Sequence, residues 1–355
     1  MNLYPLKFKP VYKEKIWGGN KISKFFKRKL SRENIGESWE VTAHPNGVSV
    51  VKNGFLQGKK ITDLIKESRK DLLGQVNIDT GGNFPLLIKF LDANQKLSVQ
   101  VHPDNNYAQK VEGEPGKTEM WYIIDCEPEA KLVYGLKPGT TRREMKKAIK
   151  QGNLENLLNE ITVKPGEVYF IPSGTIHAIE EGILLAEIQQ NSDTTYRVYD
   201  WNRTDAEGKS RPLHIDNALE VANFQQKPSS IKNKILTITT QNYNRHFLAA
   251  CPYFVTEKLE LQNSCNLKSE FTENKFIILM ILDGSGEIIH KNTKYQIKAG
   301  ETIMIPAALK EIALQGNLNL LKTYIPENKS DFITKLSNLN FSREEINQLA
   351  GIKSW

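Results

Sequence analysis

The sequence has few cysteines and no long apolar run. It holds three cysteines among 355 residues, an odd number without C-x-x-C spacing, which argues against a disulfide framework and a thiolate zinc site. No apolar run approaches the roughly 20 residues that cross a bilayer. The N-terminus, MNLYPLKFKPVYKEKIW, lacks the apolar core of a secretory signal. We therefore expect a cytoplasmic protein with no membrane partner.

The sequence also lacks a recognised nucleic-acid-binding module. Its net charge is +7, but the charge is dispersed, and the richest clusters at residues 27–29 and 142–147 sit beside ordinary helical patterning. We interpret these clusters as solvated faces and expect no nucleic-acid partner. An anionic small molecule is compatible with the positive charge. No protein partner is evident.

Short β-rich runs dominate the chain, among them PLLIKFL, KLSVQVH, EVYFIPSG and GILLAEIQQ. Apolar and β-branched residues alternate with polar ones, and Gly, Pro or Asn ends each run. Helical patterns are fewer and fall at 62–73, at 141–158 with a break at Gly152, and at 215–222. This pattern predicts a mainly β fold of the sandwich or barrel type.

One strand–turn unit occurs twice. VKPGEVYFIPSG contains Gly166 and Pro172, and IKAGETIMIPAA places Gly300 and Pro306 at the same positions. The repeat predicts two related β-domains, covering 1–230 with helical insertions and 231–326, with a polar linker at 224–233. Residues 327–355 are predicted to form a helical tail, because Ser342 and Glu345 make a capping box.

Two short segments are predicted to place side chains that can bind a metal ion on strands. In LSVQVH, alternate residues share a face, so Ser98, Gln100 and His102 point together and suit the wall of a polar cavity. In the first repeat copy, GEVYFIPSGTIH ends in His177, whereas the second copy has Glu311 there. The first domain is therefore predicted to be catalytic, and the second to lack metal ligands. With the carboxylate of Glu119 from KTEMWY, the two imidazoles and the amide form a ligand set that suits zinc, with manganese or iron as alternatives.

Four segments, QVHPDN, KTEMWY, PSGTIHAI and QQNSDTTYRVYDWNR, together resemble the type I phosphomannose isomerase family, specifically its short bacterial branch. The spacing from Gly166 to His177 also fits the second cupin motif. The resemblance implies two cupin-type β-sandwich or jelly-roll barrels with a few short helices. It implies one Zn²⁺ per chain, held by Gln100, His102, Glu119 and His177.

The same resemblance assigns roles around the metal. It implies an essential arginine at Arg197, an inward carboxylate at Glu187 and a cavity cation at Lys117. Lys89 and Ser98 are similar to positions that receive the sugar phosphate. The implied activity is interconversion of mannose 6-phosphate and fructose 6-phosphate through a cis-enediol.

For the proton transfer, Glu187 is the first candidate and Lys117 the second. If Glu187 lies in an apolar pocket, its pKa is expected to rise toward a useful value. Two other functions share the same ligand set. One is a different metal-dependent cupin enzyme of the iron oxygenase type, and the other is a non-catalytic sugar-binding cupin.

Overall fold

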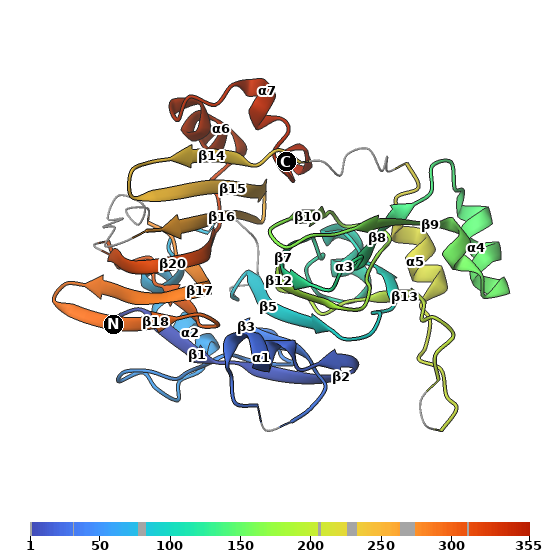
Figure 1. Cartoon of the computed structure of the whole chain (residues 1–355), viewed down its shortest axis with the longest axis horizontal. Helices are drawn as coiled ribbons and strands as arrows, with labels where there is room; N and C mark the ends of the chain where they lie inside the picture. Colours follow the sequence, from blue (N-terminus) through green and yellow to red (C-terminus); the bar gives the residue numbers. More distant parts are fainter. Residues whose placement is uncertain are drawn as a thin grey trace.

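The computed structural model describes residues 2–30, 32–76, 83–204, 207–225, 233–262, 274–310 and 312–355. Strands dominate these ranges, and they form two β-rich units that lie side by side (Figure 1). The predicted mainly β fold is confirmed. Residues 226–232 of the predicted linker and Glu311 of the repeat lie outside the described residues.

The first unit consists of two sheets. The six-stranded sheet has the order β10 (Val168–Ile171), β7 (Glu119–Cys126), β12 (Ile183–Gln190), β5 (Leu86–Ala93), β3 (Ile35–Val41), β2 (Val11–Gly19). The five-stranded sheet has the order β13 (Tyr196–Tyr199), β6 (Val99–Val101), β11 (His177–Ile179), β8 (Lys131–Leu136), β9 (Leu158–Thr162). All neighbours within the two sheets are antiparallel.

The second unit is a nine-stranded sheet. Its order is β14 (Leu236–Thr239), β15 (Tyr243–Cys251), β16 (Phe254–Leu261), β20 (Ile312–Tyr324), β17 (Ile277–His290), β19 (Thr302–Ile305), β1 (Leu6–Lys9), β4 (Val50–Val51), with β18 (Thr293–Lys298) beside β17. Leu6 pairs with Met304, so the first strand of the chain completes the sheet of the second unit. The two units thus share strands across the predicted boundary near residue 230, and the division into domains stays a prediction.

The two copies of the sequence repeat form corresponding strands. β10 follows the turn at Gly166 and β19 follows the turn at Gly300. Both glycines have positive φ, 90° and 79°, a conformation that residues with a side chain rarely adopt. Both copies of the glycine–strand–proline pattern therefore begin with glycine for the same reason, which is the positive φ that the turn requires.

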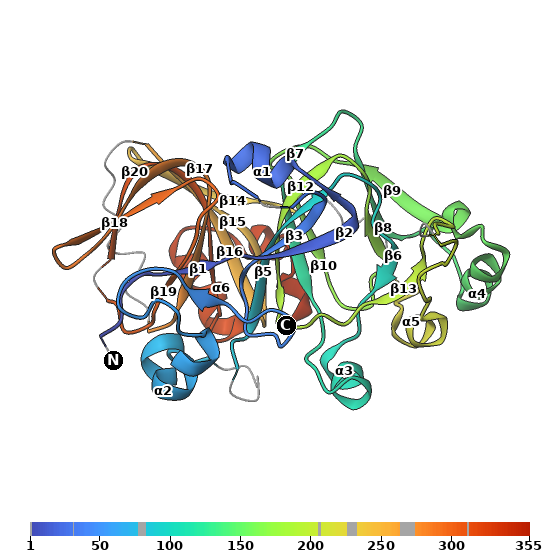
Figure 2. The same ribbon diagram turned by 90° about the horizontal axis from the view of Figure 1, so that it is seen from below.

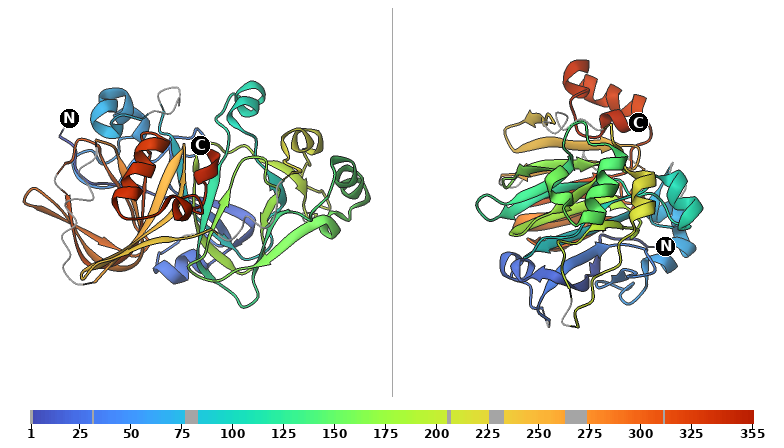
Figure 3. Two further views of the ribbon diagram at one scale, coloured as in Figure 1. Left: turned by 90° about the horizontal axis from the view of Figure 1, so that it is seen from above. Right: turned by 90° about the vertical axis from the view of Figure 1, so that its right-hand side faces the viewer.

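Most helices lie at the margins of the sheets (Figures 2 and 3). They are α1 (Lys21–Phe26), α2 (Ile61–Leu73), α3 (Asn105–Val111), α4 (Arg142–Gln151), η1 (Leu154–Leu157), α5 (Ile215–Val221), α6 (Lys329–Asn338), α7 (Arg343–Ile346) and η4 (Ile352–Ser354). The predicted helices at 62–73 and 215–222 and the first helix of 141–158 are confirmed. The second helix of 141–158 is wrong, because Leu154–Leu157 form a short 3₁₀ turn and Leu158 already begins β9, paired with β8. Among the described residues, no helix has the length and apolar character needed to cross a membrane.

The tail packs on the second unit. Ser342 and Glu345 form the predicted capping box at the start of α7. The ring of Trp355 stacks on that of Phe332 in α6, with 6.4 Å between centroids, and its Nε1–H donates to the carbonyl of Ala250 on β15. The tail therefore belongs to the folded body.

A shared hydrophobic core joins the two units. Its buried side chains come from both, including Phe170 of β10 and Phe254 of β16, whose ring centroids lie 6.3 Å apart. A separate cluster with Trp17, Leu97 and Trp121 lies inside the first unit, and Trp17 and Leu97 also line the candidate site. The site is thus built on strands fixed by packing.

Candidate active site

Three potential metal ligands from three different strands or strand ends meet inside the first unit. One ligand atom from each of His102, Glu119 and His177 lies within 4.8 Å of the other two. His102 Nε2 is 3.6 Å from Glu119 Oε2, and His177 Nε2 is 3.4 Å from Glu119 Oε1. The antiparallel pairs β10–β7 and β6–β11 fix this arrangement, with Gln100 directly opposite His177.

Backbone carbonyls orient both imidazoles. The Nδ1–H of His102 donates to the carbonyl of Thr194 at 3.0 Å, and that of His177 donates to the carbonyl of Thr175 at 2.8 Å. These bonds place the proton on Nδ1 and leave the Nε2 lone pair of each ring turned toward Glu119. Such hydrogen bonds from the second ring nitrogen are typical of metal-ligating histidines.

The electrostatics of the cluster fit a cation. His102 Nε2 and both Glu119 oxygens are buried with no hydrogen-bond partner among the described residues, which is unusual for buried polar atoms. Burial lowers the pKa of His177 to about 4 and that of His102 well below its usual value, so both rings are neutral at pH 7. Burial raises the pKa of Glu119 to about 7, against the opposing charge of Lys117. A bound cation would coordinate all three atoms, alongside the ion pair of Glu119 Oε2 with Lys117 Nζ at 3.3 Å.

Gln100 completes the donor set. Its side-chain Nε2 lies 3.3 Å from His177 Nε2. Turning the amide by 180° exchanges its nitrogen and oxygen, which brings the oxygen toward the same point. Two imidazoles, a carboxylate and an amide oxygen without thiolates make a borderline-to-hard site that suits zinc and related divalent ions.

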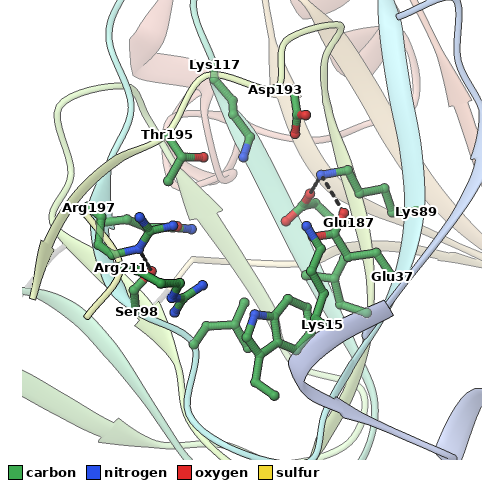
Figure 4. Close-up of a pocket in the computed structure, with 14 residues that line it drawn as sticks. Lys15, Glu37, Lys89, Ser98, Lys117, Glu187, Asp193, Thr195, Arg197 and Arg211 are labelled. Atoms are coloured by element: carbon green, nitrogen blue, oxygen red, sulfur yellow. Dashed lines mark hydrogen bonds and ion pairs between the residues drawn. The ribbon is translucent and has the colours of Figure 1, made fainter. Parts of the chain in front are cut away.

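A charged pocket of about 310 Å³ adjoins the cluster (Figure 4). Its lining consists of Lys15, Trp17, Glu37, Lys89, Leu91, Leu97, Ser98, Gln100, Lys117, Glu187, Asp193, Thr195, Arg197 and Arg211. Gln100 and Lys117 belong to the lining, and Lys117 Nζ is also 3.3 Å from Glu119 Oε2. The pocket and the cluster are therefore one site.

One end of the pocket carries a chain of ion pairs. Lys89 Nζ lies 2.9 Å from Glu187 Oε1 and 3.9 Å from Glu37 Oε2, and Lys15 Nζ lies 3.0 Å from Glu37 Oε1. Trp121 Nε1–H donates to Glu187 Oε2 at 3.1 Å. These contacts hold the carboxylate of Glu187 in one orientation, next to the strand that carries Glu119.

The surroundings of Glu187 are charged and not apolar. Burial favours a raised pKa, but the charges of Lys89 and Lys117 outweigh it, and the pKa of Glu187 is lowered. The condition for a raised pKa, an apolar pocket, is therefore not met, because Lys89 faces Glu187. Glu187 is ionised at neutral pH, as a proton acceptor must be.

The opposite end of the pocket carries arginines (Figure 4). Arg197, which pairs in register with Gln100, donates from Nε to Ser98 Oγ at 3.2 Å. Burial and the nearby charge of Arg211 lower the pKa of Arg197. Ser98 and Lys89, which the family resemblance pairs in phosphate binding, thus lie at opposite ends.

All the site residues predicted from sequence belong to the cluster or to the pocket lining. Five polar lining residues were missed: Lys15, Glu37, Asp193, Thr195 and Arg211. Asp193 and Thr195 lie within the QQNSDTTYRVYDWNR segment, so their proximity to Arg197 was a usable signal. Lys15 and Glu37 come from β2 and β3, outside the four segments that carry the family resemblance.

The fold and the site together define a cupin-type enzyme. Residues 5–132 match the family model "Phosphomannose isomerase type I, catalytic domain", and residues 243–325 match "Mannose-6-phosphate isomerase, cupin domain". The mannose-6-phosphate isomerase ManA of Bacillus subtilis is 41% identical over 326 residues, covering 92% of this chain and 100% of that protein. The mannose-6-phosphate isomerase of Streptococcus mutans is 38% identical, covering 91% and 99%. The chain belongs to the type I phosphomannose isomerase family.

Solved structures agree with this assignment. The crystal structure of the mannose 6-phosphate isomerase from Bacillus subtilis superposes with a TM-score of 0.83 at 35% identity, covering 91% of this chain and 100% of that one. A putative mannosephosphate isomerase from Archaeoglobus fulgidus, at 22% identity with a TM-score of 0.68 and coverage of 91% and 99%, shares the fold.

Proposed function

We propose that this chain interconverts mannose 6-phosphate and fructose 6-phosphate in the pocket beside the His102–Glu119–His177 cluster. The observation that carries this proposal is the charge of the lining: five cationic side chains stand against three carboxylates among the described residues. The two excess positive charges complement a phosphate monoester, which carries roughly −1.5 to −2 at pH 7. Family membership supports the same substrate.

We assign the cluster to one zinc ion, with Gln100 as the fourth ligand. When bound, the ion supplies Lewis-acid stabilisation of negative charge on the substrate oxygens. The donor set and the orphaned buried atoms support this assignment. An iron oxygenase with the same ligands would have no use for the two excess cations of the pocket.

The isomerisation moves a proton between C1 and C2 of the sugar. Glu187 is assigned as the group that carries it, because its carboxylate is ionised, oriented by Lys89 and Trp121, and open to the pocket. Lys117 is the second candidate, since its ammonium group also lines the pocket. Acid–base placement of this kind supplies about 10²- to 10⁴-fold in rate.

Arg197 is assigned to stabilise the negative charge that develops on the substrate. It stays protonated and pairs in register with Gln100, so it faces substrate oxygen atoms near the metal position. Preorganised positive charge stabilises the developing enediolate without reorganisation during the reaction. Ser98, bonded to Arg197, and Lys89, bonded to Glu187, bind the substrate from the two ends of the pocket.

A coupled assay tests the function. The purified protein is incubated with mannose 6-phosphate, and formation of fructose 6-phosphate is followed before chelation, after chelation and after zinc is restored. We expect activity that chelator abolishes and zinc restores. No isomerisation by the zinc-loaded protein would contradict the proposal and favour a non-catalytic cupin.

A further inference from the structure

The arginine end of the pocket holds more positive than negative charge among the residues that the structure describes. Each lysine of the pocket has a carboxylate partner: Lys15 pairs with Glu37, Lys89 with Glu187 and Lys117 with Glu119. At the other end, the lining residues Arg197 and Arg211 lie near one carboxylate, Asp200, which also pairs with Arg203 outside the lining. The excess of positive charge is therefore confined to one end.

Arg211 is the member of this group that joins the pocket from a loop. It follows β13 in the chain and lines the cavity, and its side chain is 31% exposed. Arg203, on the same carboxylate, does not line the cavity but donates from Nη1 to the carbonyl of Lys96 at 2.6 Å. The two arginines thus share an anchor but face different surroundings.

Two sets of contacts fix Arg211 in place. Its Nε and Nη2 donate to the two oxygens of Asp200 at 2.7 and 2.6 Å, a bidentate ion pair that leaves Nη1 without an acceptor among the described residues. The next residues are tied to Arg197, which donates from Nη1 to the carbonyl of Pro212 at 2.9 Å. The backbone N–H of Arg197 donates to His214 Nδ1, and its carbonyl accepts from the N–H of His214. The guanidinium is therefore preorganised for a ligand.

The chemistry of the ligand follows from this arrangement. A phosphate dianion neutralises two excess cations, and guanidinium groups bind it through charge-assisted hydrogen bonds. Ser98 Oγ, at 3.2 Å from Arg197 Nε, provides a hydroxyl on the same wall. At the opposite end, Lys15 and Lys89 are already paired with Glu37 and Glu187, so this end offers a phosphate no excess positive charge.

We propose that Arg211, held by Asp200, is a phosphate-binding residue of this site and sets the direction in which the substrate lies. The 6-phosphate then lies beside Arg211 and Ser98, and C1 and C2 lie between Arg197 and the Lys117–Glu187 end. The inference rests on the proposed function, because it takes the substrate to be a sugar phosphate. It assigns to Arg211 the phosphate role that the family resemblance gave to Lys89.

The test compares Arg211→Ala with Arg203→Ala in the zinc-loaded enzyme. Both variants remove one partner of Asp200, but only the first removes a cation from the pocket. For Arg211→Ala we expect the KM for mannose 6-phosphate and the inhibition constant of inorganic phosphate to rise together by about 10- to 100-fold, the usual effect of losing a charge-assisted hydrogen bond. The kcat should change by less than about threefold. Arg203→Ala should leave the phosphate inhibition constant within about threefold.

Arg211→Lys distinguishes phosphate binding from a purely structural effect. It keeps the positive charge but loses the planar pair of N–H donors of the guanidinium, so it should recover part of the phosphate affinity that Arg211→Ala loses. A fall in kcat with phosphate inhibition unchanged, or an equal loss of phosphate affinity in Arg203→Ala, would overturn the inference. Lack of isomerase activity in the unmodified protein would instead overturn the proposed function, so the two failures are distinguishable.

Discussion

Single residues decide whether the buried cluster holds a metal. His177 is fully buried, and its Nε2 faces Glu119. His177→Ala removes one imidazole ligand, so we expect bound zinc to fall from one per chain to near zero, as measured by elemental analysis after dialysis. The control is His246→Ala, which removes an imidazole from β15 of the second unit. Equal metal content in the two variants would refute the assignment of His177.

Glu187 tests the proton transfer at the same scale. Glu187→Gln keeps the shape of the side chain but removes its basicity, so kcat should fall by about 10²- to 10⁴-fold. Bound zinc should be unchanged, because Glu187 is outside the ligand cluster. Exchange of the C2 hydrogen with solvent measures the step directly, and an unchanged exchange rate would transfer the role to Lys117.

The turn before β11 shows how an element positions a ligand. Gly174 has φ of 83°, its N–H donates to the carbonyl of His102, and a Cβ there would lie 2.9 Å from the carbonyl oxygen of Val221. The glycine therefore meets both a conformational and a spatial requirement, three residues before His177.

Gly174→Ala should destabilise the protein by about 2 kcal/mol or more, since left-handed backbone costs an alanine roughly 1–2 kcal/mol before any steric clash. Gly166→Ala is a matched control, because Gly166 has φ of 90° in the same segment but open space around its Cβ position. It should lose only about 1–2 kcal/mol. Urea unfolding measures both variants. Equal losses would show that the contact with Val221 is unimportant.

At the scale of elements, much of the site was readable from the sequence. Period-two alternation placed Ser98 and Gln100 on one strand face, and the glycine–proline spacing before His177 marked its turn. Strand pairing was not readable, because alternation identifies a strand without naming its partner. The pairing of β1 with β19 at Leu6 and Met304, and the ion pair between Lys89 and Glu187, could therefore be seen only in the structure.

At the scale of the whole molecule, the second unit lacks the site but contains a buried ion cluster. Glu257 accepts from Arg245 at 2.8 and 2.9 Å and from the Tyr324 hydroxyl at 2.8 Å, and Lys322 Nζ lies 3.4 Å away. Burial favours a raised pKa for Glu257, but the charges of Lys322 and Arg245 hold it well below its usual range.

Glu257→Gln should therefore destabilise the protein by about 3–5 kcal/mol at pH 7, because it leaves buried cations without their partner. A carboxylate with a lowered folded pKa stabilises the fold above its unfolded pKa of about 4.3 and loses that contribution as the pH falls below it. The difference between variant and unmodified protein should narrow below about pH 4. Urea unfolding at several pH values measures this.

Glu260→Gln is the control for that series. Glu260 is one-third exposed and pairs with Lys258 at 2.7 Å, and a surface pair of this kind contributes about 0–1 kcal/mol. A difference between Glu257→Gln and unmodified protein that does not change with pH would contradict the account of the cluster.

We propose that four side chains from three separate segments of the sequence bind one cation beside a sugar-phosphate pocket. A crystal grown with zinc and fructose 6-phosphate, with anomalous scattering recorded at the zinc edge, tests it most directly. The account predicts one strong peak bonded to Gln100, His102, Glu119 and His177, with the phosphate beside Arg211 and Ser98. No peak at that position, or sugar phosphate bound elsewhere on the molecule, would contradict it.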